Sequence, residues 1–182
     1  MSGLLFHGGI GLFTYNGIKK AQYFAFALLA KLGDQLLGKG DGYFVTKKGS
    51  SIQIIFYNYQ HFSTLYASGE LFDMTFDNRY SPFPNMHSHK FILQLTELNG
   101  EHYIVTDTIL NKDNGSAFDK WIELGGMPLE TKEEVNYLKS VSVPKITKQR
   151  ADCPTGELLI SRTLDPHEVR LIEIKPEILT TV

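Results

Sequence analysis

The chain has 182 residues, of which 42% are hydrophobic and 12% aromatic, and this is enough apolar material to build a core. Its formal net charge of −2 and its lack of a Lys/Arg cluster argue against electrostatic binding of nucleic acid. The single cysteine, Cys153, excludes an internal disulfide and a cysteine-based zinc site.

The first residues lack the basic region of a signal peptide. The longest apolar run of the first predicted helix, Tyr23 to Ala30, is far shorter than the roughly 20 residues that span a bilayer. We therefore expect no association with a membrane and a cytoplasmic location.

The opening residues predict a strand, a turn and a helix. Leu4-Leu5-Phe6 is a short apolar run, Gly8 to Gly11 allow the backbone to turn, and apolar residues recur at helical spacing from Ile18 to Leu37. We expect the helix Ile18–Leu37 to stop at Gly38. Because a strand in such a βα unit needs neighbours on both edges, residues 1–40 are predicted to be the terminal unit of a larger parallel sheet or barrel.

The pattern changes after Gly42, and residues 41–182 are predicted to form an antiparallel β-sandwich. Seven short runs rich in β-branched and aromatic residues are expected to be strands: Tyr43–Lys47, Ile52–Tyr59, Leu71–Phe76, Lys90–Leu98, His102–Leu110, Glu157–Thr163 and Glu168–Lys175. Asn99-Gly100 lies between two of these runs, which favours a β-hairpin.

Two short helices interrupt the predicted strands. Ser116 can cap a helix over Ala117–Leu124, and Thr131 and Glu134 have the spacing of a capping box before a helix that stops ahead of Pro144. We expect the indole of Trp121 to pack the first of these helices against the sandwich.

Candidate chemical motifs each have a simpler structural interpretation. Gly9 and Gly11 form G-x-G, but Thr14 occupies the third glycine position of a dinucleotide fingerprint. His87 and His89 could share one face of a strand, yet a metal needs further ligands and the segment is typical of a loop. We therefore expect neither a cofactor nor a metal.

Carboxylates and aromatic residues leave two further alternatives. Paired acids for glycoside hydrolysis must converge on a cleft, whereas the acids here are expected on solvated surfaces. Eight aromatic residues could form a sugar-stacking platform or fill the sandwich core: Tyr57, Tyr59, Phe62, Tyr66, Phe72, Phe76, Tyr80 and Phe83.

Four segments together resemble the C-terminal part of glycoside hydrolase family 39, the β-xylosidase-like retaining glycosidases. The opening FHGGIGLFTYNGIKKAQYFAFALLAKLG resembles the eighth barrel strand and final helix of that family, and SIQIIFYNY resembles a strand of its accessory sandwich. LISRTLDPHEVRLIEI is similar to the closing strands. The most specific segment is DTILNKDNGSAFDKWIELGGMPLETKEEVNYLKS, with the ordered residues Asn114, Ala117, Trp121, Gly125 and Pro128.

The resemblance implies a non-catalytic C-terminal fragment whose sandwich buttresses a barrel. In that family an Asn-Glu pair on the fourth barrel strand supplies the acid/base and a glutamate on the seventh is the nucleophile. Both positions would precede residue 1, and no Asn-Glu dipeptide occurs in the chain. The resemblance therefore implies no catalytic residue in this chain, and the chain alone is expected to be inactive.

The resemblance also implies a set of cleft-lining residues, because barrel active sites are built from the loops at the C-terminal ends of the strands. Phe6, His7, Gly8 and Phe13 would face a β-linked saccharide in an intact parent, or pack the barrel rim. An alternative parent is an AraC-type transcriptional regulator with a sugar-sensing or structural module. Apart from a barrel partner, we expect a possible homodimer through the helix Ile18–Leu37, whose stripe carries Phe24 and Leu28.

Overall fold

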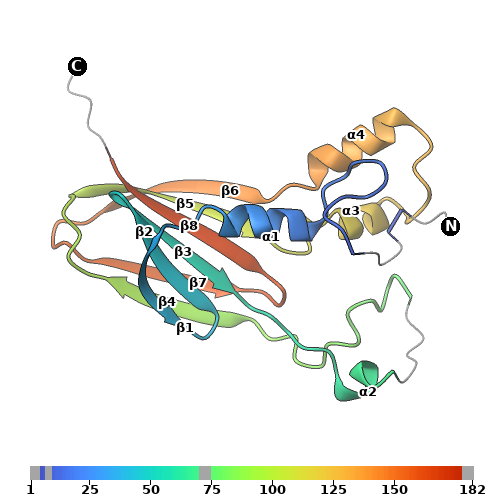
Figure 1. The fold of residues 1–182 in the computed structure, drawn as a ribbon, viewed down its shortest axis with the longest axis horizontal. Coiled ribbons are helices and arrows are strands. Elements are labelled where there is room, and N and C mark those ends of the chain that lie inside the picture. Colours follow the sequence, from blue (N-terminus) through green and yellow to red (C-terminus); the bar gives the residue numbers. More distant parts are fainter. Residues whose placement is uncertain (1–4, 7–9, 70–74, 178–182) are drawn as a thin grey trace.

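A computed structural model describes residues 5–6, 10–69 and 75–177 of the chain, and its strands form two antiparallel sheets (Figure 1). The larger sheet has the order β1-β2-β3-β8-β5-β6, and the smaller sheet pairs β4 with β7. The strands are β1 (Gln35–Gly40), β2 (Tyr43–Lys48), β3 (Ser51–Tyr57), β4 (His89–Leu95), β5 (His102–Leu110), β6 (Lys145–Asp152), β7 (Leu158–Leu164) and β8 (Val169–Pro176). The helices are α1 (Ala21–Leu29), α2 (Thr64–Ala67), α3 (Ala117–Glu123) and α4 (Lys132–Val141).

The main hydrophobic core lies between the two sheets. Phe56 of β3 packs against Phe91 of β4 with their ring centroids 4.8 Å apart, and the fully buried Ile160 of β7 belongs to the same cluster as Val105 and Ile174 of the larger sheet. Side chains alternate along each strand, so each sheet presents one apolar face to the other. The predicted mainly β, antiparallel sandwich is confirmed.

The first helix is shorter than predicted. α1 ends at Leu29, and the residues expected in its last two turns include β1, which pairs with β2. The chain turns at Gly33, whose backbone N–H donates to Thr46 Oγ1 at 2.9 Å. A Cβ at Gly33 would lie 2.1 Å from the Lys47 carbonyl oxygen, so only glycine permits this close approach. The prediction that the helix Ile18–Leu37 continues to Gly38 is therefore wrong.

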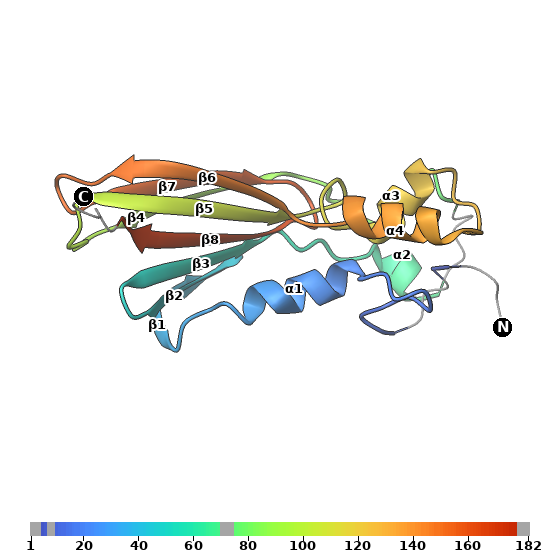
Figure 2. The ribbon, with the colours of Figure 1, turned by 90° about the horizontal axis from the view of Figure 1, so that it is seen from above.

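α1 packs on the outer face of the larger sheet, which Figure 2 shows from above. Leu28 is 3% exposed and belongs to a cluster with Ile55 of β3 and Leu171 of β8, and Phe24 packs against this cluster. The stripe that carries Phe24 and Leu28 therefore packs on the surface of the sandwich. Phe26 and Leu29 of α1 are exposed.

α3 and α4 form a separate helical end, with the caps that the sequence predicts. Ser116 Oγ accepts from the Asp119 backbone N–H, and the Thr131 and Glu134 capping box is complete. Trp121 is 1% exposed, but its neighbours are Ile18, Ala117 and Leu138 rather than sandwich strands. The expected packing of Trp121 against the sandwich is therefore wrong.

The predicted hairpin at Asn99-Gly100 is also wrong, because β4 and β5 lie in different sheets. The connection between them crosses from one sheet to the other. Its backbone is bound elsewhere: Leu98 N donates to Gly156 O at 2.9 Å, and Gly100 N donates to the Tyr103 hydroxyl at 2.9 Å. The crossing puts β4 and β5 on opposite sides of the core, where Phe91 of β4 and Val105 of β5 belong to the same cluster.

Of the remaining predicted elements, six of the seven strands are present with small shifts at their ends. The seventh, Leu71–Phe76, lies largely outside the described residues. Leu4 and the first half of the predicted turn, Gly8 and Gly9, also lie outside them. Leu5, Phe6, Thr75 and Phe76 are not in a strand. β1, β6 and α2 were not predicted. The division into residues 1–40 and 41–182 stays a prediction.

Candidate functional site

A cleft opens where the start of α1 meets the N-terminal end of α3, and its cavity measures about 410 Å³. Four separate parts of the chain contribute to it: the N-terminal segment, the start of α1, the long β3–β4 connection and α3. We refer to it as the helix-end cleft, which is lined by Phe6, Lys20, Ala21, Gln22, Tyr80, Ser116, Phe118 and Asp119. The lining combines three aromatic rings with amide, hydroxyl and charged groups.

Asp119 organises one wall of this cleft. The residue is 4% exposed. Its carboxylate accepts a hydrogen bond from Arg79 Nε at 2.9 Å and from the Tyr80 hydroxyl, which lies 3.0 Å from each carboxylate oxygen. Arg79 Nη2 lies 2.8 Å from Oδ1, and Ser116 Oγ contacts Oδ2. A buried carboxylate needs such a set of donors to remain charged. Asp119 therefore fixes the β3–β4 connection against α3.

The same contacts determine the state of Tyr80. Burial raises the pKa of its phenol far above the ordinary range, and the adjacent Asp119 charge adds to the shift. Tyr80 is therefore a neutral phenol at physiological pH. Its proton is directed to Asp119, and Arg79 contributes a hydrogen bond to its oxygen.

The structure separates the residues predicted to line a sugar cleft. Phe6 lines the helix-end cleft and packs on Phe118 and Trp121, with both centroid distances 5.5 Å. Phe13 does not line it; its ring packs on Tyr23 at 5.2 Å and is 49% exposed. His7 and Gly8 lie outside the described residues.

Sequence reasoning missed Asp119 and Tyr80 as a pair. Asp119 falls in the first turn of a predicted helix, where an acid is ordinary, and Tyr80 belongs to an aromatic run far away along the chain. Nothing at short range links the two. One sequence signal could have indicated Asp119. It lies close to Phe118 and Trp121 along the chain, which predicts a charged group next to an apolar surface.

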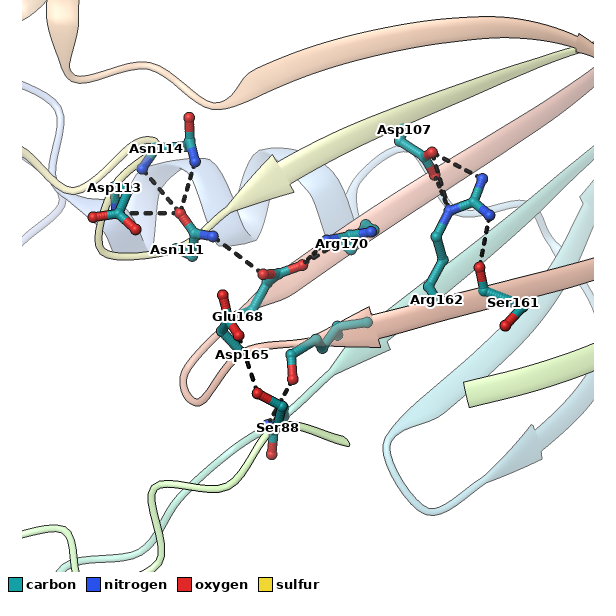
Figure 3. A network of polar contacts seen from close by, with 12 residues as sticks. Ser88, Asp107, Asn111, Asp113, Asn114, Ser161, Arg162, Asp165, Glu168 and Arg170 are labelled. Atoms are coloured by element: carbon teal, nitrogen blue, oxygen red, sulfur yellow. Dashed lines mark hydrogen bonds and ion pairs between the residues drawn. The ribbon is translucent and has the colours of Figure 1, made fainter. Parts of the chain in front are cut away.

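A second feature is a junction of polar residues at the end of the sandwich nearest the helices (Figure 3). Glu168 is 2% exposed and accepts from Asn111 Nδ2 at 3.1 Å and from Arg170 Nε at 2.8 Å. Asn58 Nδ2 donates to the carbonyl oxygens of His87 and Leu164, at 2.9 and 3.2 Å. The junction fixes the points at which the β3–β4 and β5–α3 connections leave the sheets.

An apolar groove of about 360 Å³ lies beside this junction, between α1 and the outer face of the larger sheet. Its lining residues are Ala25, Leu29, Phe44, Ile55, Tyr57, Asn58, Tyr59, His167, Glu168 and Val169. Phe44 and Tyr57 stack with an interplanar angle of 22°. The groove has few polar groups, so it lacks the hydrogen-bonding pattern of a catalytic site.

Most of the aromatic residues that were candidates for a stacking platform lie in the β3–β4 connection. Phe83 stacks on Phe62 at 4.5 Å and meets His167 edge to face at 4.3 Å, and Phe62 stacks on Tyr66 at 4.8 Å. Phe72 lies outside the described residues. The ring contacts attach this connection to the end of the sandwich, outside the main core.

No cluster of three His, Cys, Asp or Glu side chains suited to a metal occurs among the described residues. His89 stacks on Phe91 at 4.5 Å. None of the helices in the described part of the chain has the length and apolar character needed to span a bilayer.

The fold places the chain among two-sheet antiparallel β-sandwich proteins with a helix packed on one outer face. Residues 1–159 match the glycosyl hydrolases family 39, and the chain belongs to this family. A β-xylosidase from Geobacillus stearothermophilus is 27% identical over 172 residues, which cover 94% of this chain and 30% of that protein. An uncharacterized HTH-type transcriptional regulator from Staphylococcus aureus strain N315 is 28% identical over 162 residues, covering 88% of this chain and 20% of the regulator.

Solved structures agree with this fold. A monomeric β-xylosidase from Caulobacter crescentus CB15 has a TM-score of 0.76 and 20% identity, with 96% of this chain and 34% of that chain covered. The GH39 enzyme from Xanthomonas axonopodis pv. citri has a TM-score of 0.75 and 16% identity, with the same coverage. The chain therefore spans between 20% and 34% of the length of these relatives.

Proposed function

We propose that this chain is the C-terminal, non-catalytic part of a family 39 glycoside hydrolase-like protein of carbohydrate metabolism, located in the cytoplasm. Its sandwich would buttress a catalytic barrel whose substrate is a β-linked saccharide of the xyloside type. The observation that carries the proposal is the match of 94% of this chain to 30% of a β-xylosidase. The described residues supply a sandwich and helices to such an assembly.

The helix-end cleft supports the proposal that the helical end of this chain lies beside the saccharide in the intact parent. Phe6, which the resemblance implies as a cleft-lining residue of the parent, lines the helix-end cleft together with Tyr80 and Asp119. The proposal includes His7, Gly8 and Phe13 as residues that would face the saccharide in the intact parent. Phe6 would then join the barrel part to the sandwich part, because its ring also packs on α3.

A second candidate is the C-terminal module of an AraC-type transcriptional regulator, in which the same sandwich senses a sugar or has a structural role. The seven HTH-type regulator matches from Staphylococcus aureus, each 28% identical over 88% of this chain, favour it. The coding sequence preceding Met1 distinguishes the two. A barrel with both catalytic glutamates supports the enzyme, and a helix-turn-helix pair supports the regulator.

The activity of the purified chain tests its non-catalytic role. Retaining hydrolysis requires a nucleophile and an acid/base carboxyl about 5–5.5 Å apart. We expect no hydrolysis of p-nitrophenyl β-D-xyloside above the buffer rate. Turnover that persists through purification and is abolished by one Glu→Gln substitution would show that the chain has its own catalytic site.

A further inference from the structure

A small pocket of about 210 Å³ lies where the loop ahead of α1 meets the C-terminal end of α4. It shares no lining residue with the helix-end cleft. Because sites for organic small molecules usually occupy about 300–1,000 Å³, this pocket has room for a small ion rather than for a sugar. We refer to it as the lysine pocket. Its polar side chains are those of Lys19, Lys139 and Ser142, and the rest of its lining is Gly17, Ile18, Phe24 and Val143.

The fold holds the loop and the helix together at this pocket. Ile18 is fully buried and belongs to the same hydrophobic cluster as Leu138 of α4. Gly17 and Lys19, on either side of Ile18, are therefore held near the last turn of that helix. A Cβ built on Gly17 would lie 3.6 Å from Lys139 Nζ, so the ammonium group of α4 reaches the loop. A ligand would meet a backbone that is already in place, which lowers the entropy lost on binding.

Two positive charges line the pocket, and no acidic side chain does. Neither Lys19 nor Lys139 forms an ion pair with a carboxylate in the part of the chain that the structure describes. Lys19 Nζ lies 4.4 Å from the ring centroid of Tyr23 and 5.9 Å from that of Phe24, so its charge is held over aromatic rings. The carbonyl groups at the end of α4 oppose an anion, but they amount to about half an elementary charge. The two ammonium groups outweigh them.

Ser142 provides an independent indication of a ligand. The residue is 2% exposed, and its Oγ has no hydrogen-bond partner among the described residues. Its backbone N–H donates to the Leu138 carbonyl oxygen at 3.1 Å and caps α4, so the hydroxyl is not needed to end the helix. A buried hydroxyl without a partner is unfavourable. A ligand that accepts from this hydroxyl and from two ammonium groups needs a negative charge and several acceptor oxygens.

We propose that the lysine pocket binds an oxyanion of the phosphate class. Lys19 and Lys139 supply the compensating charge, and the Ser142 hydroxyl donates a hydrogen bond. Phosphate has enough oxygens to accept from all of these groups and carries more than one negative charge near neutral pH. Two sources have this chemistry: inorganic phosphate, and a phosphomonoester whose organic part stays outside the pocket. The site is separate from the proposed function, because it uses no residue of the helix-end cleft.

Isothermal titration of the whole chain with sodium phosphate, in Tris chloride at constant ionic strength, tests this site. We expect saturable binding that Lys139→Met weakens by about tenfold, the value of one charge-assisted hydrogen bond. Ser142→Ala should weaken it in the same direction. Lys148→Met is the matched control, because it removes the same charge from an exposed position of β6 outside the pocket. A parallel titration with glycerol 3-phosphate identifies the source, since the preferred form binds more tightly.

Urea denaturation provides a second measurement. Without phosphate, Ser142→Ala should be at least as stable as the wild type, because it removes a buried hydroxyl that has no partner. Phosphate should then raise the urea midpoint of the wild type more than that of Ser142→Ala or Lys139→Met. Phosphate also stabilises folded proteins in general, and Lys148→Met measures that part of the rise.

Two results would overturn the proposal. One is a wild type that shows no saturable binding of either phosphate or glycerol 3-phosphate. The other is equal binding by the two pocket variants and by Lys148→Met, which would show that phosphate associates with the surface charge and not with this pocket.

Discussion

Arg162 of β7 forms a bidentate ion pair with Asp107 of β5 across the space between the two sheets (Figure 3). Nε lies 3.1 Å and Nη2 2.9 Å from Asp107 Oδ2, and the side chains are only 16% and 11% exposed. The pair joins the small sheet to the large one by a directional contact. Hydrophobic packing alone gives no such direction.

Breaking this pair should destabilise the chain strongly. Arg162→Met leaves the Asp107 carboxylate without its partner, and the loss of one member of a buried pair costs about 3–5 kcal/mol. The Asp107→Leu/Arg162→Met double variant should recover much of that loss in urea denaturation. Arg150→Met, at an exposed ion pair, is the control and should change stability by less than about 1 kcal/mol. Additive effects of the two inter-sheet substitutions would contradict the expected coupling.

Trp121 should be the main anchor of the helical end. Its ring is buried against Phe6, Phe76 and Phe118, and its Nε1–H donates to the Met127 carbonyl oxygen at 2.6 Å. Trp121→Ala should cost about 3–5 kcal/mol, measured by circular dichroism during urea denaturation. Trp121→Phe, which keeps most of the ring volume, should cost clearly less. An unchanged midpoint for Trp121→Ala would show that this packing contributes nothing.

Stability should fall in mildly acidic solution because of His167. Burial lowers its pKa, and its ring is surrounded by the rings of Tyr59, Tyr80 and Phe83. Folding therefore favours the neutral ring over the charged one. Its contribution is fully present above the unfolded pKa of about 6.5 and is lost as the pH falls through the lower folded pKa.

The measurement is the urea midpoint between pH 8 and pH 5, compared with that of His167→Asn. Asn tolerates the positive φ of 60° at this position. The variant should lose part of the pH dependence, whereas His61→Gln, at an exposed site, should keep it. Identical pH profiles for the wild type and His167→Asn would contradict the assignment.

Self-association through the first helix stays a prediction, and the structure identifies the residues with which to test it. Phe24 and Leu28 pack toward the sheet, whereas Phe26 and Leu29 are 61% and 46% exposed. We expect the wild type to dimerise with increasing concentration in sedimentation experiments and Phe26→Asp/Leu29→Asp to stay monomeric. A wild type that remains monomeric throughout would exclude a homodimer through this face.

Sequence patterns predicted those elements whose signal is local. The caps at Ser116 and Thr131 and most strands of the sandwich follow from spacing and alternation within a few residues. β6 was missed because it is an edge strand without apolar alternation. All of its residues except Ala151 are exposed, and many of them are charged. β1 was missed because Leu36 and Leu37 continue the apolar pattern of the helix.

Long-range relationships could not be predicted in this way. The pairing of β4 with β7, rather than β5, depends on which sheet each strand joins, and the Asn99-Gly100 turn signal carries no information about that. The candidate site shows the same limit. Phe6 followed from a family resemblance, while its association with Tyr80 and Asp119 arises from a connection between β3 and β4 that folds toward α3.

The position of β8 has a consequence for how the chain is made. β8 is synthesised after the other described strands, yet it lies between β3 and β5 and pairs with both, with Ile172 opposite Ile54 on one side and Asp107 on the other. Until it emerges, β1-β2-β3 and β5-β6 are two separate half-sheets, each with an unpaired strand that another nascent chain could join. A chain truncated before residue 169 would therefore be prone to aggregation, because β8 joins the two halves of the larger sheet.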